Sequence, residues 1–203
     1  ATKDSYTLQY ERAGMDWAEF TPVEFRFSKD IEDRYTQWLA SKSVSEHEYT
    51  ILHIGGSGPL KKYPNKFWKK IAESVASGDD EVCVLMGGPR DTIPDIDHPF
   101  VRYSFNASLD LSARIICGAK VVVAGDTGAL HIAGNCGVPT CSLWGFTSPE
   151  HSAKFYKNAT WLTSDLNCAP CFLQRASWCH KTRGGIPDCM RHISPYSVIK
   201  QLS

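Results

Sequence analysis

The sequence predicts an α/β fold, a Rossmann-like parallel sheet with helices on both faces. From Tyr49 onward a pattern recurs: a short apolar run, a glycine-containing turn, then a segment with helical periodicity. This alternation is typical of parallel strands joined by helical crossovers. Ligands of such sheets bind at the carboxyl ends of the strands. We therefore expect the turns at residues 55–58, 87–91, 125–128 and 145–149 to meet along one edge.

Each element follows from its own pattern. Short apolar or alternating runs predict strands at residues 6–10, 23–27, 49–54, 81–86, 100–105, 120–124, 139–144 and 159–163. Apolar residues at helical spacing predict helices at residues 28–43, 65–77, 107–119, 129–137 and 194–203. Ser28 and Ser194 are suited to cap the first and last of these helices, and Leu109 and Leu111 are expected to face inward.

Composition predicts a globular protein of 203 residues, 42% apolar and 22% charged. The 22 basic and 22 acidic side chains give no net charge, and hence no electrostatic reason to expect a nucleic acid partner. Apolar runs stay well short of the ~20 residues of a membrane helix, so we expect no transmembrane segment. We divide the chain into an N-terminal segment, residues 1–45, and a Rossmann-like domain, residues 46–203.

The turn Asp126-Thr127-Gly128 carries the letters of an aspartic protease signature. Aspartic proteases need two such turns, whose two carboxylates share one proton, and their fold is almost entirely β-structure. Here one turn is followed at once by a helical segment, so the protease is a remote alternative.

In a strand–turn–helix setting the same residues form an anion site, because helix N-termini present free N–H groups and a positive dipole end. A diphosphate fits near Thr127 and Gly128, and Asp126 could accept hydrogen bonds from sugar hydroxyls. His131, one helical turn on, could donate to a phosphate or a leaving group. The alternative for His131 is a structural role, as a partly buried side chain whose hydrogen bonds are satisfied within the protein.

The earlier turn, "GGSGPLKKYP", places Ser57, Lys61 and Lys62 beside flexible backbone. It does not match the phosphate-binding loop of nucleoside triphosphatases. The first strand is also not followed by the Gly-x-Gly-x-x-Gly of dinucleotide dehydrogenases.

Residues 106–150 closely resemble the C-terminal half of family 9 glycosyltransferases, the heptosyltransferase-like enzymes. The matching positions are Asp126, Thr127, Gly128, His131, Gly137, Pro139, Gly145, Thr147 and Pro149. Lys61, Tyr63 and Pro64 match the family's segment before a helix, and the resemblance covers residues 50–203.

The resemblance implies one half of a GT-B fold, the half that binds a nucleotide-diphosphate sugar linked to ADP or UDP. The other half would bind a saccharide or glycolipid acceptor and supply the general base. Transfer would invert the anomeric centre without a cofactor. The implied catalytic residues are Lys61, Asp126 and His131. The implied donor-binding residues are Gly56, Ser57, Asp91, Asp126, Thr127, Gly128 and Thr147.

An acceptor domain needs at least ~100–150 residues, more than residues 1–45 provide. We therefore expect this segment to be a remnant or linker, and a longer natural protein or a second chain to complete the cleft. A binding module without turnover is the alternative. The resemblance implies lipopolysaccharide or glycan synthesis in the cytoplasm or at the inner membrane.

The eight cysteines fall into two groups. Those in apolar runs are predicted to be small buried hydrophobes: Cys83, Cys117, Cys136 and Cys141. The others lie in a Cys-rich loop, about residues 165–190, and could hold a structural Zn or Fe ion: Cys168, Cys171, Cys179 and Cys189. One branch of the resembled family carries a four-cysteine iron site with wider spacing. Reduced thiols or disulfides are the alternatives.

Overall fold

A computed structural model describes residues 11–14, 23–56, 58–78, 81–173 and 176–202. It contains a six-stranded sheet of order β3-β2-β1-β4-β5-β6, in which every neighbouring pair is parallel. This is the strand order of doubly wound nucleotide-binding sheets, with its switch point between β1 and β4. The strands are β1 (Tyr49–His53), β2 (Val82–Gly87), β3 (Val101–Phe105), β4 (Val121–Gly125), β5 (Thr140–Trp144) and β6 (Ala159–Thr163). The predicted fold class is confirmed.

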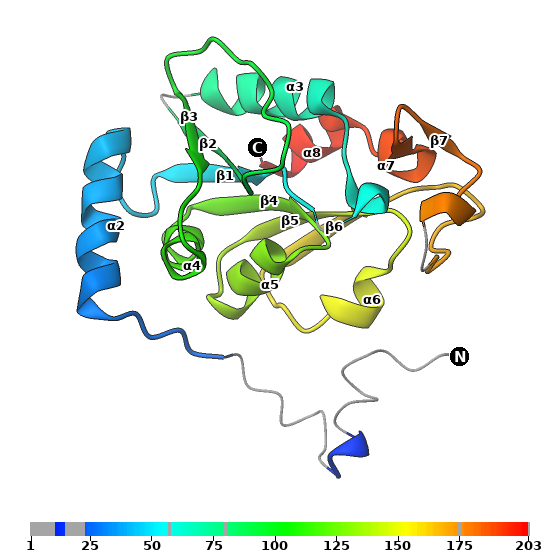
Figure 1. The fold of residues 1–203 in the computed structure, drawn as a ribbon, viewed down its shortest axis with the longest axis horizontal. Coiled ribbons are helices and arrows are strands. Elements are labelled where there is room, and N and C mark those ends of the chain that lie inside the picture. Colours follow the sequence, from blue (N-terminus) through cyan, green and yellow to red (C-terminus); the bar gives the residue numbers. More distant parts are fainter. Residues whose placement is uncertain (1–10, 15–22, 57, 79–80, 174–175, 203) are drawn as a thin grey trace.

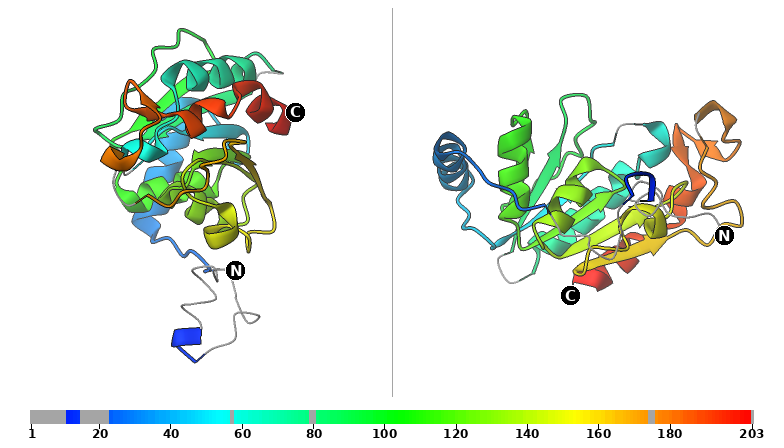
Figure 2. Two further views of the ribbon diagram at one scale, coloured as in Figure 1. Left: turned by 90° about the vertical axis from the view of Figure 1, so that its right-hand side faces the viewer. Right: turned by 90° about the horizontal axis from the view of Figure 1, so that it is seen from below.

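Helices cover both faces of the sheet, as Figure 1 shows from one side and Figure 2 from two others. One face carries α3 (Asn65–Ala76), α7 (Asp188–His192) and α8 (Pro195–Leu202). The other carries α2 (Lys29–Lys42), α4 (Leu109–Cys117), α5 (Gly128–Asn135) and α6 (Pro149–Ser152). The short elements are η2 (Pro59–Lys61), η3 (Ala176–Trp178) and the hairpin β7 (Thr182–Arg183) with β8 (Ile186–Pro187).

Each face of the sheet has its own apolar core. Trp68 and Ile71 of α3 pack on one side with Leu85 of β2, while Ile115 and Leu130 from α4 and α5 pack on the other. Burying a large apolar side chain stabilises the fold by roughly 1.5–3 kcal/mol. Two such layers fix the positions of the strand ends, where the glycine turns lie.

Helix α2 begins and packs as its sequence predicts. The Ser28 side chain accepts a hydrogen bond from the Ile31 N–H at 3.4 Å. The Tyr35 hydroxyl lies 3.1 Å from that of Tyr49, which donates to the Ile115 carbonyl at 2.6 Å. Residues 29–42 thus share the core of the sheet, and the domain boundary at residue 45 stays a prediction.

Two sequence predictions are wrong. Residues 23–27 form no strand, because no neighbouring strand pairs with them in the described chain; the Val23 N–H instead donates to Oδ1 of Asn135 at 3.0 Å. Leu109 is 80% exposed because it is the first residue of α4, ahead of the turns that reach the sheet. The strand predicted at 6–10 lies outside the described residues. None of the described helices is both long and apolar enough to cross a bilayer.

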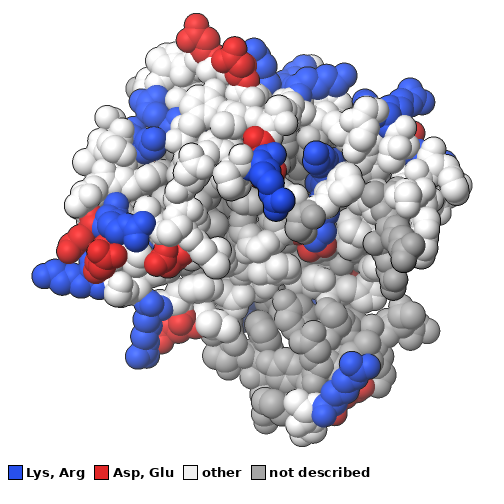
Figure 3. Space-filling view, viewed as in Figure 1, with Lys and Arg blue, Asp and Glu red and all other residues white. Residues whose placement is uncertain are grey.

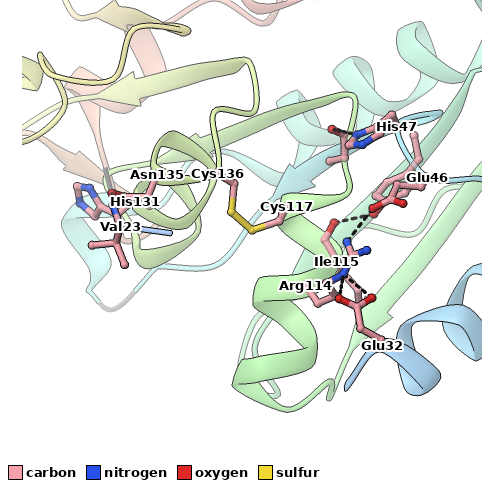
Figure 4. The surroundings of a disulfide bond; sticks show 12 residues. Val23, Glu32, Glu46, His47, Arg114, Ile115, Cys117, His131, Asn135 and Cys136 are labelled. Carbon is pink, nitrogen blue, oxygen red and sulfur yellow. Dashed lines mark hydrogen bonds and ion pairs between the residues drawn. A yellow bond between two sulfur atoms is a disulfide. The ribbon is translucent and has the colours of Figure 1, made fainter. Parts of the chain in front are cut away.

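A disulfide joins Cys117 at the end of α4 to Cys136 at the end of α5, with Cα atoms 5.4 Å apart (Figure 4). The prediction of separate buried hydrophobes is therefore wrong for these two residues. The two cysteines are 19 positions apart, and this spacing does not predict that they pair. They pair because α4 and α5 pack side by side. Cys83 and Cys141 are buried and free, as predicted.

Gly118, which follows α4, gives a test of this packing. A Cβ atom there would lie 2.0 Å from the Tyr35 hydroxyl oxygen and 3.0 Å from that of Tyr49. We expect Gly118→Ala to lower the free energy of unfolding by about 1–3 kcal/mol, because the crowded hydroxyls must move. Urea unfolding followed by circular dichroism measures this.

The matched control is Gly58→Ala, at an extended residue with open space around the added Cβ. It should change stability by less than about 0.5 kcal/mol. Equal losses in the two variants would show that the Tyr35 contact is not the cause.

Candidate functional site

The turns after β1 and β4 meet at the switch point of the sheet, beside a cavity of about 860 Å³. Its lining includes His53, Gly56, Asp91, Thr127 and Gly128, and also Gly184 and Ile186 from the β7–β8 hairpin. A larger hollow of about 1040 Å³ lies at the opposite, amino-terminal edge and contains none of the predicted site residues. Because ligands of such sheets bind at the carboxyl ends, the smaller cavity is the candidate site.

Asp126, directly after β4, is the centre of the polar contacts. Nζ of Lys61 lies 3.0 Å from its Oδ2 and donates to its backbone carbonyl at 2.6 Å. The Thr147 hydroxyl donates to Oδ2 at 3.1 Å, and Nε2 of His131 lies 3.7 Å from Oδ1. The structure thus brings together four residues that the sequence places on three separate turns and one helix.

The Asp126 carboxylate is held in its ionised form. Burial alone would raise its pKa, but hydrogen bonds and charge from His131, Lys61 and Thr147 outweigh that effect, and the net pKa is lowered. An ionised carboxylate paired with a lysine is suited to accepting hydrogen bonds. The turn also leads from a parallel strand into α5, so the aspartic protease alternative has no support.

Thr127 and Gly128 begin helix α5 at the edge of the cavity. The side chain of the N-cap residue Thr127 makes no capping hydrogen bond, which leaves N–H groups of the first turn of α5 to a ligand. The buried hydroxyl of Thr127 has no hydrogen-bond partner among the described residues. A Cβ placed on Gly128 would meet nothing within 4 Å, so the space in front of the helix is open.

Asp91 lies at the other end of the cavity, after β2. Its Oδ2 accepts the Gly88 N–H at 2.7 Å, and a Cβ on Gly55 would come within 2.6 Å of that oxygen. His53, the last residue of β1, lines the same cavity; burial lowers its pKa, against an opposing effect of Asp91. Sequence reasoning missed His53, although its place at the end of an apolar run, two residues before Gly55, was the available signal. Ser57 lies outside the described residues.

The family model of glycosyltransferase family 9 (heptosyltransferase) matches residues 8–180. The chain belongs to this family. Lipopolysaccharide heptosyltransferase 1 of Pseudomonas aeruginosa is 26% identical over 166 residues, which are 76% of this chain and 47% of that protein. This family 9 chain spans about half the length of the relatives it matches.

Solved structures of the same family share the fold. The glycosyl transferase family 9 protein from Veillonella parvula superposes with a TM-score of 0.72 at 16% identity, over 94% of this chain and 55% of that one. The E. coli heptosyltransferase WaaC with ADP-2-deoxy-2-fluoro heptose gives 0.59 at 17% identity, over 97% and 53%.

The Cys-rich loop of this family 9 chain lies beside the candidate site, because its hairpin residues Gly184 and Ile186 line the cavity. Cys168 and Cys171 are exposed, Cys179 is half-buried and Cys189 is buried. Burial raises the pKa of the Cys189 thiol to about 11, against a lowering effect of the Met190 backbone, and the three other cysteines add a smaller rise. However, no three Cys, His, Asp or Glu side chains of the described chain are gathered closely enough to hold a metal ion.

Positive charge at the site is local. On the face in Figure 3, the described Lys and Arg side chains are interspersed with Asp and Glu rather than gathered into one basic field. A negatively charged ligand would therefore be attracted by Lys61 and the start of α5, together with Lys62 and Arg90 of the cavity lining.

The lowered pKa of Asp126 gives a pH prediction. An unfolded aspartate has a pKa of about 3.9, so the stabilisation is complete above about pH 4 and is lost as the pH falls towards the lower folded pKa. We expect Asp126→Asn to lower the free energy of unfolding at pH 7 by about 1–3 kcal/mol and to flatten the acid limb of its pH profile.

Denaturant unfolding between pH 2 and 7 measures both effects. Asp165→Asn is the control, because Asp165 forms an exposed ion pair with His192 and its loss should cost about 0–1 kcal/mol. An unchanged acid limb in Asp126→Asn would contradict the assignment.

Proposed function

We propose that this chain is the donor-binding part of an inverting, heptosyltransferase-like glycosyltransferase. The observation that carries the proposal is the cluster of Lys61, Asp126, His131 and Thr147 beside the open start of α5. The ligand would be a nucleotide-diphosphate sugar, linked to ADP or UDP. The related WaaC structure with an ADP-sugar analogue supports this choice.

The diphosphate would lie at the start of α5, against Thr127, Gly128 and Lys61. Free N–H groups and the helix dipole favour an anion there. Lys61 now contacts the Asp126 carboxylate, and a phosphate oxygen would share its ammonium group. As the sugar–phosphate bond breaks, negative charge grows on the leaving diphosphate, and a cation already held in place stabilises it.

The sugar would face Asp126, Thr147 and His131. The ionised Asp126 accepts hydrogen bonds from hydroxyls, and Nε2 of His131 points to the same carboxylate. Inversion needs a base on the opposite side of the sugar, which an acceptor-binding part would supply. No step in this scheme requires a cofactor.

The nucleoside would occupy the end of the cavity near Asp91 and Gly56. A ribose diol is a double hydrogen-bond donor that suits the Asp91 carboxylate, which already lies close to the glycine backbone. Ser57, from the same turn, is proposed as a further contact.

A binding module that holds the nucleotide sugar without turnover is the second candidate. Both candidates use the same cavity, so binding alone does not separate them. An assay of sugar transfer to a saccharide acceptor, carried out with the complete protein, separates the two candidates.

We also propose that Cys168, Cys171, Cys179 and Cys189 fasten the loop that carries the β7–β8 hairpin. Cys179 and Cys189 stand on either side of the hairpin, whose Gly184 and Ile186 line the cavity. Four thiolates suit Zn or Fe in kind. The described side chains are not gathered closely enough to hold an ion as they stand, so a bound ion would have to draw them together. A bound ion would fix the loop and would not take part in transfer.

Calorimetric titration with ADP tests the proposed function. We expect Lys61→Ala together with Gly128→Trp to abolish measurable binding, because the ammonium group is lost and an indole fills the open space. Lys120→Ala is the control, since its lysine pairs with Glu81 at the opposite edge of the sheet. Equal affinity of the double variant and the wild type would contradict the phosphate site.

Metal analysis of freshly purified protein tests the cysteine proposal. We expect about one Zn or Fe per chain, and a loss of that metal in Cys168→Ser with Cys171→Ser. Six titratable thiols in metal-free protein, with Cys117 and Cys136 paired, would instead identify a loop of free cysteines.

A further inference from the structure

Tyr156 lies behind His131, on the side of the imidazole away from Asp126. Its hydroxyl oxygen is 3.0 Å from Nδ1 of His131, and the residue is only 5% exposed. The ring rests directly on helix α5 at Gly134, where a Cβ would come within 2.4 Å of it. The absence of a side chain at this one position lets the phenol reach the histidine.

Asn135 fixes the direction of the hydrogen bonds around Tyr156. Its Oδ1 accepts the Val23 N–H at 3.0 Å, and its Nδ2 donates to the His131 carbonyl at 2.8 Å. A backbone N–H can only donate and a carbonyl can only accept, so the orientation of the amide is determined. Nδ2 therefore also donates to the Tyr156 hydroxyl, at 3.4 Å. Figure 4 shows Val23, His131 and Asn135 together at this end of α5.

The other ring nitrogen of His131 faces a group that can only accept. Nε2 lies 3.7 Å from Oδ1 of Asp126. An ionised carboxylate opposite a bare nitrogen lone pair is repulsive, whereas an N–H in that place is attractive. The neutral imidazole therefore carries its proton on Nε2, and Nδ1 accepts the hydrogen of the Tyr156 hydroxyl.

We propose that Tyr156 and Asn135 are positioning residues that hold His131 with its N–H directed into the donor site. Hydrogen bonds run from Asn135 to Tyr156 and from Tyr156 to Nδ1, and Nε2 faces Oδ1 of Asp126 at 3.7 Å. His131 is then a donor to anionic oxygen without needing a positive charge, and Nε2 is not free to act as a base. The identity of that oxygen rests on the proposed function, but the position of the proton does not.

Nitrogen NMR of the ¹⁵N-labelled, ligand-free chain at a pH where histidines are neutral tests the proposal. In the wild type we expect the proton on Nε2 of His131 and a hydrogen-bonded Nδ1. In Tyr156→Phe the Nδ1 resonance should move to that of an imine nitrogen without a hydrogen bond. Asn135→Asp should do the same, because the Tyr156 hydroxyl then donates to the new carboxylate.

Tyr103→Phe is the matched control: it removes a hydrogen-bonded hydroxyl near Pro94 and Ile96 and should leave the His131 nitrogens unchanged. ADP affinity should fall roughly two- to tenfold in Tyr156→Phe, the usual effect of one lost hydrogen bond. A proton on Nδ1 in the wild type, or an unmoved Nδ1 resonance in Tyr156→Phe, would overturn the inference. If the wild type shows the expected nitrogen pattern but does not bind ADP, only the proposed function is overturned.

Discussion

The contact between Lys61 and Asp126 joins the two halves of the sheet at its switch point. Lys61 follows β1, Asp126 follows β4, and these adjacent strands diverge into helices on opposite faces. Such divergence leaves a crevice that apolar packing alone does not close. The ammonium group bridges it by contacting both the carboxylate and the backbone carbonyl of Asp126. The same two charges that stabilise the crevice are those that a charged ligand would meet.

The two walls of the candidate site are built from different kinds of structure. Asp126, Thr127 and His131 lie on a strand end and a helix packed into the core, so their geometry is set by α4, α5 and the sheet. The wall formed by the β7–β8 hairpin lies in an irregular loop, and Ile186 of this hairpin packs against the core that carries α3. Regular elements therefore place one wall of the site, while an irregular loop anchored at Ile186 places the other.

Much of this could be predicted from local patterns. Asp126, Thr127 and Gly128 stand in a strand–turn–helix whose chemistry depends on neighbours in the sequence, and the structure has the same local order. Their roles in binding stay predictions. Contacts between distant segments left no such pattern: Tyr156 is 25 residues from His131, and the Cys117–Cys136 disulfide follows from helix packing. Residues 23–27 alternate like a strand, but a strand exists only where another edge is available to pair with it.

The disulfide between Cys117 and Cys136 does more than join two helix ends, because it closes a covalent ring in the chain. The chain between them contains β4, the Asp126 turn and the whole of α5, so a single covalent ring includes the strand, the turn and the helix that build the site. A peptide bond broken anywhere inside that ring would leave both fragments attached to each other. In a reducing compartment the ring is open, and only strand pairing and core packing hold the same fragments together once the chain is cut.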